Sequence, residues 1–193
     1  MARIGAELRR QDFIEATVKV IAEYGVANAT TRRIAMAADS PLASLHYVFH
    51  TKDELFYAVY ESLINMPQPT LEHVPAGATA AESVAQMLRQ LVRWFAARPD
   101  LATAQFELYT WTLRNNPEMA SKIYAVSGEA TEQAIARFSG SQLDKAALTT
   151  ISRLFINLFD GLLLSWSAHC DLERLEAETE TACQALELLV ASY

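Results

Sequence analysis

The chain has 193 residues, of which 51% are apolar and 20% are charged, and its formal net charge at pH 7 is −7. This composition suits a soluble globular protein with one large domain, or with a small domain joined to a larger one. No apolar run approaches the length of a membrane span, because residues 158–166 are interrupted by Asp160 and Gly161. The first residues lead into an amphipathic helix and not a signal peptide, and Cys170 and Cys183 form no CxxC pair, so we expect reduced cysteines in a cytoplasmic protein.

The charge is unevenly distributed along the chain. Residues 1–52 hold seven basic and five acidic side chains, a net charge of +2, so the other 141 residues carry −9. A mildly basic end on an acidic body is what a DNA-binding protein with a separate second function shows. The negative overall charge therefore does not exclude nucleic acid as a partner.

The first predicted helix covers residues 8–24. One face carries residues at helical spacing, and Gly25 is suited to end the helix in a left-handed conformation. This face consists of Phe13, Ile14, Thr17, Val20, Ile21 and Tyr24. The segment is therefore predicted to pack one side against a core.

Residues 30–52, TTRRIAMAADSPLASLHYVFHTK, predict two short helices separated by a tight break. Thr30 can cap the first helix through its hydroxyl. The break follows at residues 39–41, because proline fixes φ and biases the residue before it away from the helical region. The second helix covers residues 42–49, and small alanines allow the two helices to cross closely. This pattern predicts a helix-turn-helix, whose second helix enters the DNA major groove.

The motif IAxAA, a break, LxYxF and then TKDEL resembles the DNA-binding domain of the TetR family of bacterial transcriptional regulators, over about residues 8 to 60. The sequence departs from the family pattern at four positions. Asp39 replaces the usual glycine between the helices, and Asp also tolerates a left-handed conformation. Leu42 stands where a polar residue commonly opens the recognition helix, and His46 and Val48 replace the usual tyrosine and histidine.

We predict DNA contacts from the cationic, polar and small residues of this segment. They are Thr30, Arg32, Arg33, Leu42, Ala43, Ser44, His46, Tyr47 and Lys52. Arg32 and Arg33 lie in the first turn of a helix, where the helix dipole disfavours cations, so a phosphate partner explains them better than a solvated face. Tyr47 and Lys52 are expected to hold phosphates as well.

Three of these residues are predicted to lie near the base edges of the operator. Ser44 and His46 can reach bases or the backbone. Leu42 cannot donate a hydrogen bond, so we expect an apolar contact, for example with a thymine methyl group.

The rest of the chain is predicted to be helical with one clear linker at residues 66–78, which holds three prolines. Capping boxes of the form T-x-x-E occur at residues 51–54 and 79–82. The expected helices after the helix-turn-helix cover residues 51–66, 79–98, 100–114, 118–138 and 144–168, with a turn at 139–142 and a final helix capped by Asp171. The fold class is therefore all-α, with an N-terminal helix-turn-helix DNA-binding domain at 1–52 and a larger helical ligand-binding and dimerisation domain at 53–193.

The last two helices are the most apolar part of the chain, so we expect them to be buried on more than one side. One side can face the chain's own core, and the other side needs a partner. The predicted dimer-interface residues are Leu158, Gly161, Leu162, Leu186 and Leu189. Pairing the two helices with their copies gives the four-helix interface that the TetR resemblance implies. A two-fold dimer would place two recognition helices roughly 34–36 Å apart and require a near-palindromic operator.

The central helices carry many aromatic residues. Single aromatics at helical spacing are usually core, but as a set they could line an apolar cavity. The predicted ligand-binding residues are Phe95, Phe106, Tyr109, Trp111, Asn157 and Trp166, with Glu107, Arg114 and Asp160 as further polar anchors. We expect a small, largely apolar effector that favours a state whose recognition helices are wrongly spaced for DNA.

No catalytic pattern is found. His46 and His50 lie one turn apart without the acidic residue of an HExxH motif, and no glycine-rich phosphate loop or GxSxG motif occurs. Residues 169–171, HCD, are more typical of a polar turn than of a metal site. We therefore predict no enzyme, no metal and no cofactor. The sequence predicts a homodimeric repressor released by a small molecule; a ligand-dependent activator, or a binding module that keeps the helix-turn-helix as a scaffold, are the alternatives.

Overall fold

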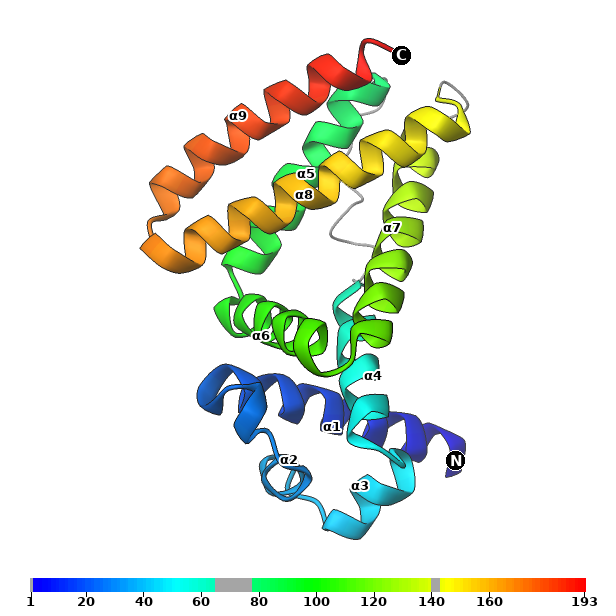
Figure 1. The fold of residues 1–193 in the computed structure, drawn as a ribbon, viewed down its shortest axis with the longest axis vertical. Helices are drawn as coiled ribbons and strands as arrows, with labels where there is room; N and C mark the ends of the chain where they lie inside the picture. The colour runs from blue at the N-terminus through cyan, green and yellow to red at the C-terminus, as the bar shows by residue number, and fades with distance from the viewer. Residues whose placement is uncertain (1, 65–77, 140–142) are drawn as a thin grey trace. The chain divides into compact units, whose positions relative to one another are not determined.

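A computed structural model describes residues 2–64, 78–139 and 143–193 (Figure 1). Every regular element in those ranges is helical, which confirms the predicted all-α class. The elements are α1 (Ala2–Tyr24), the 3-10 turn η1 (Val26–Asn28), α2 (Thr31–Ala37), α3 (Leu42–Val48), α4 (Lys52–Ile64), α5 (Ala80–Ala96), α6 (Pro99–Asn115), α7 (Pro117–Ser139), α8 (Lys145–His169) and α9 (Leu172–Val190). The predicted linker at 66–78, except its last residue, and most of the turn at 139–142 lie outside the described residues.

The helix starts follow the capping residues seen in the sequence. The side chains of Asp144 and Asp171 accept backbone N–H bonds at the starts of α8 and α9, and Thr79 forms a full capping box with Glu82 at the start of α5. The predicted capping box at residues 51–54 forms only in part. The N–H of Glu54 donates to the Thr51 hydroxyl as expected, but the Glu54 carboxylate accepts the N–H of His50 and not that of Thr51. α1 is longer than predicted and begins at Ala2.

The chain forms two compact units, and each unit combines two segments that are separated in the sequence. The first combines residues 1–65 with 99–123, and the second combines 66–98 with 124–193. α4 and α6 thus pack in the same unit as the helix-turn-helix. The predicted division at residue 52 is a functional boundary, which a packing boundary does not test, so it stays a prediction.

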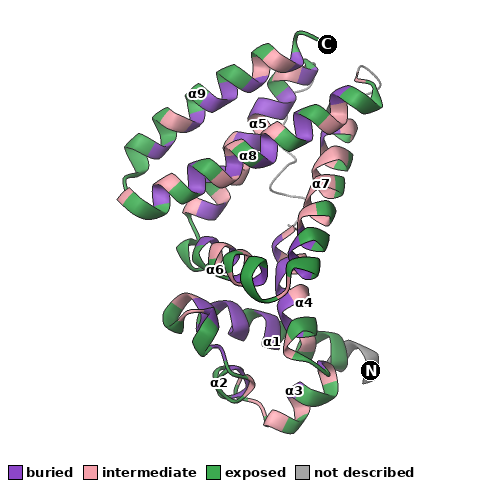
Figure 2. Ribbon diagram, viewed as in Figure 1, coloured by how far each residue is buried: buried purple, intermediate pink, exposed green. Residues whose placement is uncertain are grey.

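In the first unit, α1 packs against α2, α3, α4 and α6. Ile34 of α2, Leu45 of α3 and Phe49, which follows α3, are at most 1% exposed and hold the two short helices against the core. α4 meets α6 through Phe56 and Trp111, whose ring centroids lie 5.4 Å apart in an edge-to-face arrangement. The purple stripes in Figure 2 mark these buried faces.

In the second unit, α5, α8 and α9 pack together. Phe95 of α5 meets Phe159 of α8 edge-to-face at 5.2 Å. The Cys183 thiol of α9 is buried and donates to the carbonyl of Ala85 at 3.4 Å, and burial raises its pKa to about 11. Such a thiol is inert, which agrees with a structural role.

Among the described residues, α8 is long and apolar enough to cross a membrane by length and composition alone. The interruption at Asp160 and Gly161 therefore does not shorten the apolar run as expected. In its most apolar window, 44% of residues are buried within the chain. The core helix of a soluble protein passes the same test, so α8 does not indicate a membrane protein.

Candidate nucleic-acid interface

The turn between α2 and α3 is held by a defined hydrogen-bond pattern. Asp39 adopts the left-handed conformation expected from the sequence, with φ 46°. The N–H of Ser40 donates to Ala35 O at 3.0 Å and that of Asp39 donates to Met36 O at 3.1 Å, which is a Schellman motif. The turn therefore fixes the direction in which α3 leaves α2.

α3 presents one exposed face and one buried face (Figure 2). Leu45 is 1% exposed and anchors the helix, whereas Ala43, His46 and Tyr47 are exposed and fall at i, i+3 and i+4. The Tyr47 ring is 83% exposed, which is unusual for a large aromatic in a folded chain. The major groove of DNA admits an α-helix, so these exposed side chains are available to meet base edges or phosphates.

The two arginines of α2 have different surroundings. Among the described residues, nothing pairs with the exposed guanidinium of Arg32. The guanidinium of Arg33 donates to Asn28 O at 2.8 Å and lies 4.4 Å from the ring centroid of Tyr24. The N–H of Arg33 donates to the Thr30 hydroxyl, so Thr30 is engaged as the helix cap. Arg32 is therefore the freer of the two cations.

Leu42, Ser44 and Lys52 are only half-exposed. Leu42 packs against the apolar core, so part of the side chain predicted to meet a thymine methyl is turned inward. The Lys52 ammonium lies over the rings of Phe56 and Trp111, with 4.8 Å and 5.8 Å to their centroids, and burial lowers its pKa. A phosphate contact by Lys52 would require its ammonium to leave these rings.

Glu107 of α6 and Asn116, the residue between α6 and α7, bond to the segments on either side of the helix-turn-helix, and this role was not predicted. The Glu107 carboxylate accepts the N–H of Val26 in η1 at 3.2 Å. The Asn116 amide donates to the Asp53 carboxylate, in the first turn of α4, at 3.0 Å. The first pair is separated by 81 positions and the second by 63 positions, so no local sequence pattern links the partners.

The six predicted ligand-binding residues are divided between the two units. Phe106, Tyr109 and Trp111 lie in α6 of the first unit, and Phe95, Asn157 and Trp166 lie in α5 and α8 of the second unit. Within the second unit, Asn157 accepts a hydrogen bond from the Tyr124 hydroxyl at 3.0 Å. The indole N–H of Trp166 is buried without an acceptor in the described structure.

The predicted dimer residues also differ in exposure. Leu162 and Leu186 are buried inside the chain, at 8% and 0% exposure, so they support the α8–α9 packing and offer no surface to a partner. Leu158 and Leu189 are half-buried, and Gly161 is exposed. The large exposed side chains on these helices are Leu164, Leu172 and Leu188, which the sequence analysis did not select.

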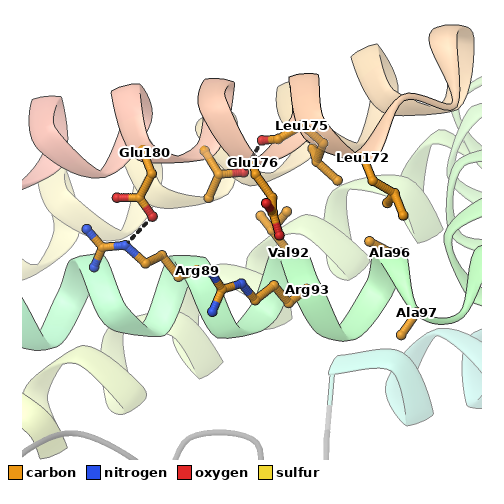
Figure 3. A pocket seen from close by; sticks show the side chains of 10 residues that line it. Arg89, Val92, Arg93, Ala96, Ala97, Leu172, Leu175, Glu176 and Glu180 are labelled. Atoms are coloured by element: carbon orange, nitrogen blue, oxygen red, sulfur yellow. Dashed lines mark hydrogen bonds and ion pairs between the residues drawn. The ribbon is translucent and has the colours of Figure 1, made fainter.

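A groove of about 230 Å³ lies between α5 and α9 (Figure 3). Val92 and Leu175 form its apolar floor, and Arg89 reaches across it to Glu180, with Nε to Oε1 at 2.7 Å. Arg89 also lies 3.6 Å from Glu187, so its charge is neutralised within the chain. None of the predicted ligand-binding residues lines this groove.

Residues 13–59 match the family model described as bacterial regulatory proteins, tetR family. Over 170 residues the chain is 28% identical to the nicotine-responsive transcriptional repressor HdnoR of Paenarthrobacter nicotinovorans, covering 86% of this chain and 87% of that protein. It is similar in structure to a TetR transcription regulator from Haloarcula marismortui, with a TM-score of 0.72, 21% identity and coverage of 96% and 98%. It is also similar to the multidrug binding protein EbrR complexed with ethidium, with a TM-score of 0.69, 24% identity and coverage of 94% and 98%.

The helical fold and the exposed face of α3 thus define a helix-turn-helix DNA-binding protein. Residues 13–59 therefore form a DNA-binding domain of the tetR type. Regulators of this type are non-enzymatic DNA-binding transcription factors and are usually homodimers.

Proposed function

We propose that the protein is a homodimeric repressor whose DNA binding is relieved by a small organic effector. The observation that carries the proposal is the exposed face of α3 formed by Ala43, His46 and Tyr47, which has no role in the packing of its own unit. Arg32 adds a cation in the preceding helix that no other described residue pairs with. In the proposed functional division, residues 1–52 bind DNA and residues 53–193 bind effector and partner.

The sign of regulation and the type of effector are supported by the relatives. HdnoR is named as a nicotine-responsive repressor, and EbrR is a multidrug binding protein solved with ethidium. The first name describes a response to nicotine, and the second describes binding of drugs, with ethidium present in the solved complex. A similar response here requires that the effector bind better to a state with misplaced recognition helices. We expect this regulator to act in the cytoplasm, where TetR-type regulators typically occur.

The proposed dimer uses the outer faces of α8 and α9. Leu164 and Leu188 are 60% and 76% exposed, and Gly161 is exposed on the same side of α8 as Leu164. A Cβ added at Gly161 would meet nothing within 4 Å in its own chain. An exposed glycine within a helix allows a second helix to approach closely. This face of α8 can therefore pair with the same face of a second chain.

The test is selection of bound sequences from a random DNA library by the purified protein at two salt concentrations. We expect a near-palindromic consensus whose two half-sites are separated by about one helical turn. His46→Ala and Tyr47→Ala should change the consensus or weaken it at defined positions. Leu113→Ala, which removes an exposed apolar residue of α6, is the matched control and should leave the consensus unchanged.

Binding that is weak, strongly salt-dependent and blind to sequence would contradict sequence-specific repression and favour a binding module that keeps the helix-turn-helix as a scaffold. An effector that strengthens operator binding would instead identify an activator. Both outcomes differ from the expected one, in which the protein binds a specific operator and the effector releases it.

A further inference from the structure

Asp160 lies in the apolar helix α8 and is half-buried. Among the described residues, no hydrogen-bond donor or cation pairs with its carboxylate, and burial raises its pKa from 3.8 to about 6. A charged carboxylate in such surroundings is destabilising unless a partner compensates the lost water. The position of Asp160 therefore needs an explanation.

The other shifted carboxyl groups of this unit show what compensation looks like. They are Glu82, Glu132, Glu178 and Glu180, and hydrogen bonds lower the pKa of each one. Glu180, for example, accepts from Arg89 at 2.7 Å, and Glu132 accepts from Thr149 and Lys145. Asp160 alone in this set has a pKa shifted in the opposite direction.

Asp160 also belongs to a cluster of oxygen acceptors between α7 and α8. Asn157 precedes it by three residues and therefore lies next to it on the helix surface. The Asn157 amide oxygen accepts from the Tyr124 hydroxyl of α7 at 3.0 Å. Because Asn157 adjoins Asp160 on the surface of α8 and contacts the Tyr124 hydroxyl, the carboxylate lies on the side of α8 that meets Tyr124. Burial, and to a smaller extent the charge of Asp160, raises the pKa of Tyr124. One negative charge thus lies beside an aromatic ring and a neutral oxygen.

We propose that Asp160 is the anionic anchor of the effector site and that the effector is a small organic cation, a protonated or quaternary amine on an aromatic or aliphatic body. The inference rests on the proposed function, because it names the ligand class of the same regulatory site. A carboxylate supplies the charge, and the Tyr124 ring can attract a cation through its face. The described residues hold no group of three or more potential metal ligands, so the site does not suit a metal ion.

The experiment uses the full-length protein and matched pairs of probes that differ only in charge. Phenyltrimethylammonium and its uncharged isostere tert-butylbenzene form one pair, and larger aromatic and aliphatic quaternary amines with their carbon isosteres form the others. Binding is measured by calorimetry, and release of the selected operator is measured by fluorescence anisotropy. We expect at least one cation to bind more than about tenfold more tightly than its isostere and to release the DNA.

Asp160→Asn keeps the shape and removes the charge. It should weaken binding of that cation by roughly 10- to 100-fold and leave binding of the isostere within about twofold. Glu129→Gln removes an exposed charge from α7 in the same unit. It should change neither the binding of the cation nor the binding of the isostere. Tyr124→Phe should preserve the charge preference, because the ring and Asp160 both remain.

Several results would overturn the inference. If no cation is preferred over its isostere, or if Asp160→Asn leaves the preference intact, Asp160 is not the anchor. If Asp160→Asn weakens dimerisation and not cation binding, the missing cation comes from a second copy of the chain. Release of DNA by neutral or anionic compounds alone would reject the cationic effector but keep the proposed function. If compounds of every charge class fail to affect DNA binding, the proposed function fails as well.

Discussion

At the scale of single residues, neighbours in sequence have different roles because their surroundings differ. Arg32 and Arg33 adjoin in α2, and the sequence predicts phosphate contacts for both. Within the described ranges only Arg33 contacts other residues of its own chain through its guanidinium, at Asn28 O and the Tyr24 ring. The residue type alone therefore does not assign the phosphate contact.

Arg32→Ala should weaken binding to all DNA sequences alike and lower the slope of log K against log salt by about one, because one counterion-releasing contact is lost. Its free energy of unfolding should change by less than about 0.5 kcal/mol. Arg33→Ala is the matched comparison and should cost about 1 kcal/mol of stability through its lost internal contacts. Salt titrations of operator binding and urea unfolding measure the two effects. Equal loss of stability in both variants would contradict the assignment.

The raised pKa of Asp160 predicts that the stability of the protein depends on pH. Its pKa is raised in the folded state, so the folded protein binds the proton more tightly than the unfolded chain between about pH 4 and 6. The stability due to the neutral form is fully present below pH 4 and is lost as pH rises through about 6. Asp160→Asn should therefore be more stable than the wild type by roughly 1–3 kcal/mol at pH 8, and the difference should vanish near pH 4. Urea unfolding across this range measures it, and a difference independent of pH would contradict the raised pKa.

At the scale of elements, the turn between α2 and α3 is decided by one residue in a left-handed conformation. Asp39 has φ 46°, where most side chains are disfavoured. Asp39→Gly should retain or raise stability by up to about 1 kcal/mol, and Asp39→Val should lower it by roughly 1–2 kcal/mol. Thermal unfolding compares the two variants. If valine were tolerated as well as glycine, the left-handed turn would be wrong.

α6 shows how an element distant in sequence completes the DNA-binding unit. It supplies the Glu107 bond to η1, and Asn116, the residue that follows it, donates to Asp53 of α4. The Gly25 backbone next to η1 has φ 76°, and a Cβ there would lie 3.6 Å from the Glu107 carboxylate. The first three helices are therefore positioned in part by a helix that the sequence assigned to the other domain.

At the scale of the whole molecule, the proposed dimer makes a prediction about oligomeric state. Gly161→Trp should fold, because a Cβ at this site meets nothing within 4 Å in its own chain, but the bulky ring should prevent close pairing of α8 with its copy. Gly128→Trp in α7, where a Cβ also meets nothing within 4 Å, is the control. Analytical ultracentrifugation should show monomers for the first variant and dimers for the second. A Gly161→Trp variant that remains fully dimeric would exclude this face.

The helices and their ends were predictable because their signals are local. Caps such as Thr30 and Asp171, the glycine at position 25 and the apolar spacing of α1 act within a few residues of the structure they determine. The helix-turn-helix is also contained in one continuous stretch. Its core residues Ile34 and Leu45 could therefore be separated from its outward residues by periodicity alone.

Only the tertiary structure decided which apolar or charged side chain has a partner. Leu186 and Leu188 look alike in the sequence, yet one is fully buried and the other is 76% exposed, since burial depends on helices far away in the chain. The same reason separates Glu180, which meets Arg89 of α5, from Asp160, which meets no cation in the described structure. Local patterns thus determined the helices and the DNA-binding motif of this protein. Long-range packing determined which surfaces remain open for DNA, a second subunit and an effector.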